Sequence, residues 1–144
     1  MPAIEVERSV AYLVKRVQQG LRRRLDAALK PTGLSMAQYA ALRALAEHPE
    51  ASGAELARLC FVTRQSLQDL LTGLRAAGLV EAANAPPRGR SQSLSLTRRG
   101  SRQLTAAHGA VLAVEAEMLQ GISATEHRRA ADVLLRCAGN VERA

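Results

Sequence analysis

The segment Thr63–Gln68 places five hydrogen-bonding side chains at the start of a stretch with helical periodicity. They belong to Thr63, Arg64, Gln65, Ser66 and Gln68. An apolar stripe runs through the same stretch at helical spacing and consists of Leu67, Leu70, Leu71 and Leu74. An arginine fork fits the guanine edge in the major groove of DNA, and a glutamine amide fits the adenine edge. The pattern therefore favours a helix that contacts DNA, although an ordinary solvated helix face has the same residue types.

A second group of arginines follows in residues 85–100, which read APPRGRSQSLSLTRRG. The prolines and the glycine predict a turn, and the alternation of polar and apolar residues after them predicts a strand. Arg88 and Arg90 lie at this turn, where an arginine can enter the minor groove of DNA. Arg98 and Arg99 begin the next predicted helix, where they oppose the helix dipole and fit phosphate contacts. A solvated loop is the alternative role for the turn.

Positive charge is concentrated in this part of the chain. The whole sequence has 20 basic and 13 acidic residues, a formal net charge of +7. Residues 63–102 hold seven arginines and two acidic residues, a net charge of +5. Such a balance indicates a polyanionic partner, since charge reports on partners rather than on fold. A nonspecific or architectural DNA-binding protein and a protein-interaction domain are the alternatives to a sequence-specific one.

Other chemistry has little support in the sequence. His48, His108 and His127 lie at unrelated spacings, and we find no metal-ligand, nucleophile or nucleotide-binding motif. We therefore expect no catalytic residue, no metal and no cofactor. Cys60 and Cys137 form no CxxC pair, and neither a signal peptide nor an apolar membrane span is visible. We expect a cytoplasmic protein with reduced thiols and no membrane partner.

Periodicity and caps predict the elements that position these residues. The chain has 144 residues, 47% of them hydrophobic and 2% aromatic, which fits one domain with an aliphatic, mainly helical core. Capping boxes of the form S-x-x-E/Q mark helix starts at Ser35, Ser52 and Ser123. Helices are predicted over 4–29, 35–47, 52–60, 63–77, 97–120 and 123–138, and strands over 79–83 and 91–97.

A short helix, a tight turn, a second helix and a hairpin form a winged helix-turn-helix. The predicted fold class is mainly α with a small β-hairpin. The helix over 97–120 would be roughly 35 Å long, which is too long for this domain alone to bury. We therefore expect one domain over 1–144 that forms a homodimer. Its helical dimerisation region comprises 1–34 and 101–144, and its winged helix-turn-helix comprises 35–100.

Five short motifs occur in a characteristic order along the chain. They are Gln38-Tyr39, Leu56-Ala57, Val62-Thr63-Arg64-Gln65-Ser66, Gly78-Leu79-Val80 and Leu96-Thr97-x-x-Gly100. With these motifs the sequence resembles the MarR family of bacterial winged-helix transcription regulators over essentially its whole length. The resemblance implies a homodimeric repressor of a palindromic operator. It also implies release by a small aromatic or phenolic ligand, by a lipophilic drug or by thiol oxidation.

The resemblance implies an effector cleft between the helical region and the winged helix. The residues that it places in this cleft are Tyr12, Arg16, Met36, Tyr39, His108 and Val111. An arginine beside a tyrosine could hold an aromatic carboxylate. Packing in the core is the alternative role for Tyr12, Met36 and Tyr39.

Two positions depart from the family pattern. Wings of the family usually carry Asp-x-Arg before the second strand, whereas this chain has Arg88 in place of the aspartate and keeps the arginine as Arg90. Because the aspartate braces an arginine in the family, we expect a more mobile wing and more salt-dependent DNA binding. Arg75 replaces a frequently acidic residue, and it either adds charge on the DNA side or pairs with a neighbour.

The two cysteines are the remaining reactive groups. Cys60 is predicted to be a small buried apolar residue between Leu59 and Phe61, and Cys137 either meets its mate in a dimer or stays free. The thiol-sensing branch of the family has its cysteine near the start of the first helix, where this chain has none. Thiol-oxidation sensing is therefore an alternative to ligand sensing.

Overall fold

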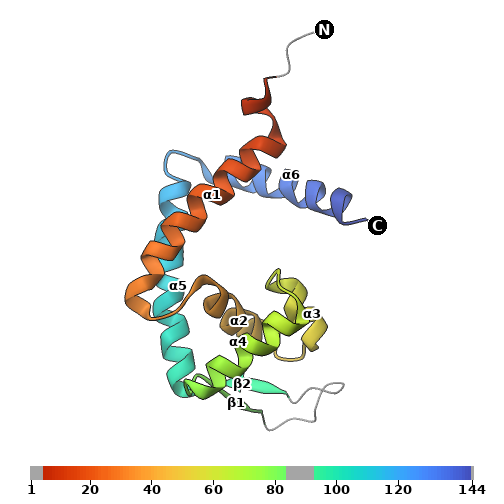
Figure 1. The fold of residues 1–144 in the computed structure, drawn as a ribbon. Coiled ribbons are helices and arrows are strands. Elements are labelled where there is room, and N and C mark those ends of the chain that lie inside the picture. The colour runs from red at the N-terminus through yellow and green to blue at the C-terminus, as the bar shows by residue number, and fades with distance from the viewer. Residues whose placement is uncertain (1–4, 84–92, 144) are drawn as a thin grey trace.

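The structure is a computed structural model that describes residues 5–83 and 93–143. Within these ranges it has six α-helices, two short 3-10 helices and a two-stranded hairpin (Figure 1). The α-helices are α1 (Val10–Leu29), α2 (Met36–Glu47), α3 (Gly53–Leu59), α4 (Arg64–Ala76), α5 (Arg98–Met118) and α6 (Ala124–Glu142). The 3-10 helices are η1 (Val6–Arg8) and η2 (Lys30–Thr32), and the strands are β1 (Val80–Ala82) and β2 (Leu94–Leu96). The predicted fold class is confirmed.

A serine or threonine begins each of these α-helices. Its side chain accepts a hydrogen bond from the backbone N–H three residues later, which satisfies one donor of the first turn. These caps are Ser9, Ser35, Ser52, Thr63, Thr97 and Ser123. The three predicted capping boxes form with both of their hydrogen bonds.

Two predicted helix boundaries were wrong. The first helix begins at Val10 rather than near residue 4, because Ser9 caps it and η1 precedes the cap. The last helix continues past residue 138 to Glu142. Gly139 does not end it, since a glycine inside a helix costs only about 1 kcal/mol relative to alanine.

The winged helix contains the core of the protein. Leu42 on α2 and Leu74 on α4 are fully buried, and they meet side chains from α3, α5 and the hairpin. In the antiparallel hairpin Val80 pairs with Leu96, and Ala82 pairs with Leu94. The strands are shorter than predicted, and residues 91 and 92 of the predicted second strand lie outside the described residues.

A tight junction joins the hairpin to α5. The backbone N–H of Thr97 donates to the carbonyl of Leu79 at 3.0 Å, and its hydroxyl donates to the carbonyl of Gly78 at 2.7 Å. Gly100 packs directly on this backbone, since a Cβ at that position would lie 2.0 Å from the Leu79 oxygen. The start of α5 is therefore fixed against the base of the wing.

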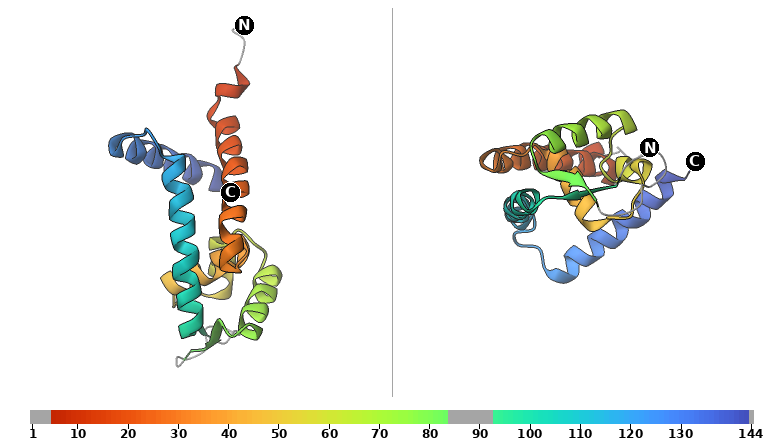
Figure 2. Two further views of the ribbon diagram at one scale, coloured as in Figure 1. Left: turned by 90° about the vertical axis from the view of Figure 1, so that its left-hand side faces the viewer. Right: turned by 90° about the horizontal axis from the view of Figure 1, so that it is seen from below.

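Helices α1 and α5 extend side by side away from the winged helix, and α6 crosses at their far end (Figure 2). Gln103 on α5 ties the two helices together at their base by donating to the carbonyl of Thr32 at 2.9 Å. None of the residues of α6 is buried. Within the described part of the chain, no helix is long and apolar enough to cross a membrane.

Candidate DNA-binding surface and effector cleft

Helix α4 presents its polar residues to solvent and its leucines to the core. Leu67, Leu71 and Leu74 are buried, whereas Leu70 is half-buried. The five side chains predicted to contact DNA are all exposed: Thr63, Arg64, Gln65, Ser66 and Gln68. The leucine stripe therefore anchors the helix and leaves its opening turns available to a partner.

These five side chains differ in their own hydrogen bonds. Thr63 is engaged as the helix cap, accepting from the Ser66 N–H at 3.0 Å and donating to the Ser66 hydroxyl at 3.0 Å. Gln65 donates to the Asp69 carboxylate at 3.2 Å. Arg64 and Gln68 make no side-chain hydrogen bond or ion pair with a described residue. Their donors are therefore unused in the described part of the protein, as a base-reading contact requires.

The first turn of α5 supplies a second cationic surface. Arg98, Arg99 and Arg102 are exposed, and none of them forms an ion pair with a described residue. Their position at the N-terminus of a helix is unfavourable for a cation in the absence of an anion. Arg88 and Arg90, the predicted wing contacts, lie outside the described residues.

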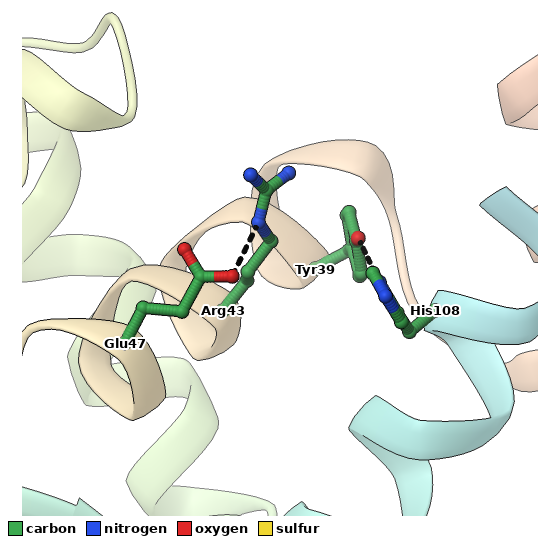
Figure 3. Close-up of polar contacts among 4 residues, drawn as sticks. All are labelled: Tyr39, Arg43, Glu47 and His108. Carbon is green, nitrogen blue, oxygen red and sulfur yellow. Dashed lines mark hydrogen bonds and ion pairs between the residues drawn. The ribbon is translucent and has the colours of Figure 1, made fainter. Parts of the chain in front are cut away.

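The predicted effector residues of α2 and α5 meet between these helices. The hydroxyl of Tyr39 and Nδ1 of His108 share a hydrogen bond of 2.9 Å, and the two rings stack with centroids 6.3 Å apart (Figure 3). Tyr39 is buried, whereas His108 is exposed. Met36 and Val111 lie one turn from these two residues and pack against the core. The four residues therefore share one side of the junction between the winged helix and α5.

The predicted effector residues of α1 lie elsewhere. Tyr12 and Arg16 are exposed. Arg16 lies about 20 Å along α1 from Leu29, the residue at which the helix reaches the winged helix. Arg16 lines an open hollow of about 570 Å³ between α1 and α5, together with Val114 and Met118. Within one chain, the six predicted effector residues therefore form two groups rather than a single pocket.

Arg43, which lies one turn after Tyr39 on α2, was not predicted from the sequence. Its Nε donates to the Glu47 carboxylate at 3.1 Å (Figure 3). Partial burial lowers the pKa of the Arg43 guanidinium, but the ion pair with Glu47 and the proximity of Tyr39 outweigh that effect and raise it. The group is thus a permanent cation beside the Tyr39–His108 pair. The i, i+4 spacing from Tyr39 was the signal that could have located it.

Comparison with known proteins decides the family. A sequence model of the MarR family matches residues 32–91. The HTH-type transcriptional repressor Rv2887 of Mycobacterium tuberculosis is 37% identical over 119 residues, which cover 83% of this chain and 86% of that protein. The chain belongs to the MarR family.

Two crystal structures of MarR family protein Rv2887 extend the similarity to three dimensions. Its complex with salicylic acid superposes with a TM-score of 0.72 at 35% identity, covering 90% of this chain and 96% of the other. Its complex with DNA gives a TM-score of 0.70 at 34% identity, covering 90% and 97%. This MarR family member is therefore a transcriptional regulator with a DNA-binding winged helix.

Of the two positions predicted to distinguish this MarR family member, the structure describes Arg75. Arg75 is exposed and makes no ion pair with a described residue, so the described contacts do not support pairing with a neighbour. The replacement of the wing aspartate by Arg88 falls outside the described residues and stays a prediction.

The two cysteines of this MarR family member are free thiols in different surroundings. Cys60, the C-cap residue of α3, is half-buried against the core rather than fully buried as predicted. Burial raises the pKa of the Cys60 thiol, which disfavours the reactive thiolate. Cys137 is exposed on α6.

Proposed function

We propose that the protein is a homodimeric repressor that binds a palindromic operator through α4 in the major groove and the wing in the minor groove. One observation carries this proposal: the first turns of α4 are exposed while its leucines are buried, and Arg64 and Gln68 have no partner among the described residues. Recognition helices of this motif place their N-terminal side chains on base edges. The repressor activity of the relative Rv2887 gives the sign of regulation.

The remaining contacts follow from the positions of the side chains. Arg64 and Gln68 are assigned to base edges, where arginine and glutamine read guanine and adenine. Thr63, Gln65 and Ser66 are assigned to bases or phosphates beside them. Arg98 and Arg99 are assigned to phosphates, because they are exposed at a helix N-terminus. Arg88 and Arg90 are assigned to the minor groove on the strength of the sequence alone.

The dimer is assigned to residues 1–34 and 101–144, which contain α1, α5 and α6. These helices and the turn between α5 and α6 carry exposed apolar side chains that a single chain does not cover, namely Val10, Leu13, Val14, Val17, Leu112, Ile122, Val133, Leu134, Leu135 and Val141. Large apolar side chains exposed in such number favour an interface. A second copy of the chain covers them and places two copies of α4 on the two halves of a palindrome.

The effector is assigned to the class of small aromatic or phenolic acids. Rv2887 has been crystallised with salicylic acid, and the cation of Arg43 lies beside the Tyr39–His108 pair in this chain. A guanidinium binds a carboxylate, and the exposed ring of His108 provides a stacking surface. Cys60 fits thiol sensing poorly, because burial raises its pKa.

Substitution of Arg64 tests the operator contact. Arg64→Ala should weaken binding to the operator by roughly 1–3 kcal/mol and reduce the preference among operator variants, as measured by fluorescence anisotropy with duplexes selected from random DNA. Arg90→Ala should weaken binding to most sequences, because a wing arginine reads groove shape. Arg75→Ala, which removes the same charge from the other end of α4, should leave the preference unchanged. An Arg64→Ala protein with the wild-type preference would contradict the assignment.

A further inference from the structure

The turn between α3 and α4 has a phenylalanine, Phe61, at a position where glycine is usual. After α3 ends at the C-cap Cys60, the N–H of Phe61 donates to the carbonyl of Arg58 at 3.2 Å, and the N–H of Val62 donates to that of Ala57 at 3.0 Å. This pair of hydrogen bonds defines a Schellman motif, whose C′ residue must be left-handed. Phe61 occupies that place with φ of 56°.

The same motif ends α4, but with a glycine. There Gly78 has φ of 76° and donates to the Arg75 carbonyl at 3.0 Å, while Leu79 donates to the Leu74 carbonyl at 2.9 Å. Among the described residues, every other residue with positive φ is likewise a glycine. A side chain with a Cβ is strained in this conformation, so Phe61 destabilises the turn relative to glycine.

Packing does not compensate for this strain. Phe61 is the one phenylalanine of the chain, and 94% of its surface is exposed. A large apolar side chain gains nothing for folding when it stays in water. Strained residues that the fold itself does not need are typical of functional positions.

The position of Phe61 indicates DNA as its partner. It lies two residues before Thr63, which caps the recognition helix, and it is flanked by the exposed cations Arg58 and Arg64. The N-terminus of this helix is the end that enters the major groove. A phenyl ring there meets deoxyribose or a thymine methyl group, and phenylalanine makes apolar contact with that methyl. Cations on both sides disfavour a basic protein partner and favour the DNA backbone.

We propose that Phe61 is an apolar DNA contact that extends the recognition surface of α4 at the expense of the stability of its turn. This inference rests on the proposed operator binding. It predicts that one substitution moves stability and DNA affinity in opposite directions. A residue with a merely structural role in the turn would move both in the same direction.

Two substitutions separate the ring from the strain. Phe61→Gly removes both, so its melting temperature should rise by about 2–8 °C while operator affinity falls about tenfold. Phe61→Ala removes the ring but keeps the Cβ and its strain. Its operator affinity should therefore fall by the same factor, without the rise in melting temperature. A loss of affinity in Phe61→Gly alone would mean that only the rigidity of the turn matters, and it would overturn the proposal.

The operator itself identifies the contacted group. Replacing thymine by deoxyuridine removes the 5-methyl group, so a thymine contact weakens wild-type binding and leaves Phe61→Ala unaffected. A deoxyribose contact leaves both proteins insensitive to this replacement while Phe61→Ala still binds more weakly. Unchanged operator affinity of Phe61→Ala would overturn the proposal. The same result is expected if Phe61 contacts a protein instead of DNA. Arg64→Ala is measured on the same duplexes as a control. If Arg64→Ala loses affinity while Phe61→Ala does not, the Phe61 contact is wrong and the proposed operator binding still holds.

Discussion

Arg64 and Arg43 are exposed arginines on neighbouring helices, but their surroundings differ. Arg64 has no partner among the described residues, so its guanidinium is available to a base. Arg43 is held by Glu47 and lies beside Tyr39. The polar character of the α4 opening could be predicted from sequence, because it depends on local spacing. The Tyr39–His108 contact joins residues 69 positions apart. Its geometry could not be predicted, because it depends on how α2 packs against α5.

Substitution of Arg43 tests the effector assignment. Arg43→Gln should raise the Kd for salicylate by roughly 10- to 100-fold, because a hydrogen bond to a charged group contributes about 1.5–3 kcal/mol. Titration calorimetry measures this change, and release of the operator duplex by salicylate should require correspondingly higher concentrations. Arg43→Lys keeps the charge without the planar fork and should lie between the two proteins. Salicylate that releases DNA equally well from Arg43→Gln would rule out this residue as the carboxylate contact.

At the scale of elements, caps were the most reliable signal in the sequence. The serine and threonine residues at helix starts and the S-x-x-E/Q boxes could be read directly, because a cap is a contact over three residues. The start of α1 was placed too early, because apolar periodicity alone does not register the cap at Ser9. The close approach of α5 to the wing could not be predicted, since it joins backbone atoms of Leu79 and Gly100 that are distant in sequence.

Substitution of Gly100 tests this junction. Gly100→Ala should destabilise the protein by about 1–3 kcal/mol, because the added Cβ forces α5 away from the Leu79 carbonyl. Chemical denaturation measures the loss. Gly109→Ala is the matched control on the same helix, where a Cβ meets no atom within 4 Å, and it should stabilise by about 0.5–1 kcal/mol. If Gly100→Ala is as stable as Gly109→Ala, the junction does not pack as described.

At the scale of the whole molecule, the winged helix is a packed domain, whereas α1, α5 and α6 form an extended helical region with few buried side chains. The winged helix buries most of the residues of the core, whereas α6 buries none of its residues. Figure 2 shows α6 at the far end of α1 and α5, away from the winged helix. The excess of apolar helix could be predicted from length and periodicity alone. The arrangement of the proposed second copy could not be predicted, because it depends on contacts between chains.

The dimer can be tested on α6. Leu134→Asp should convert the dimer to monomers, because it places a charge within the apolar surface, and light scattering coupled to gel filtration measures the mass. Operator affinity should fall sharply in this variant, since each monomer then binds one half-site. Arg136→Glu introduces an acidic group two residues away, on the opposite face of the helix, and should remain dimeric. A dimeric Leu134→Asp protein would place the interface elsewhere.

The central claim is that this MarR family member recognises a specific DNA sequence. Its most direct test compares the Kd of the wild-type protein for an operator selected from random duplexes with its Kd for a scrambled duplex of the same composition, at physiological salt. We predict binding at least about 1,000-fold tighter to the selected operator. Equal affinity for both duplexes would contradict the account and identify a nonspecific DNA-binding protein.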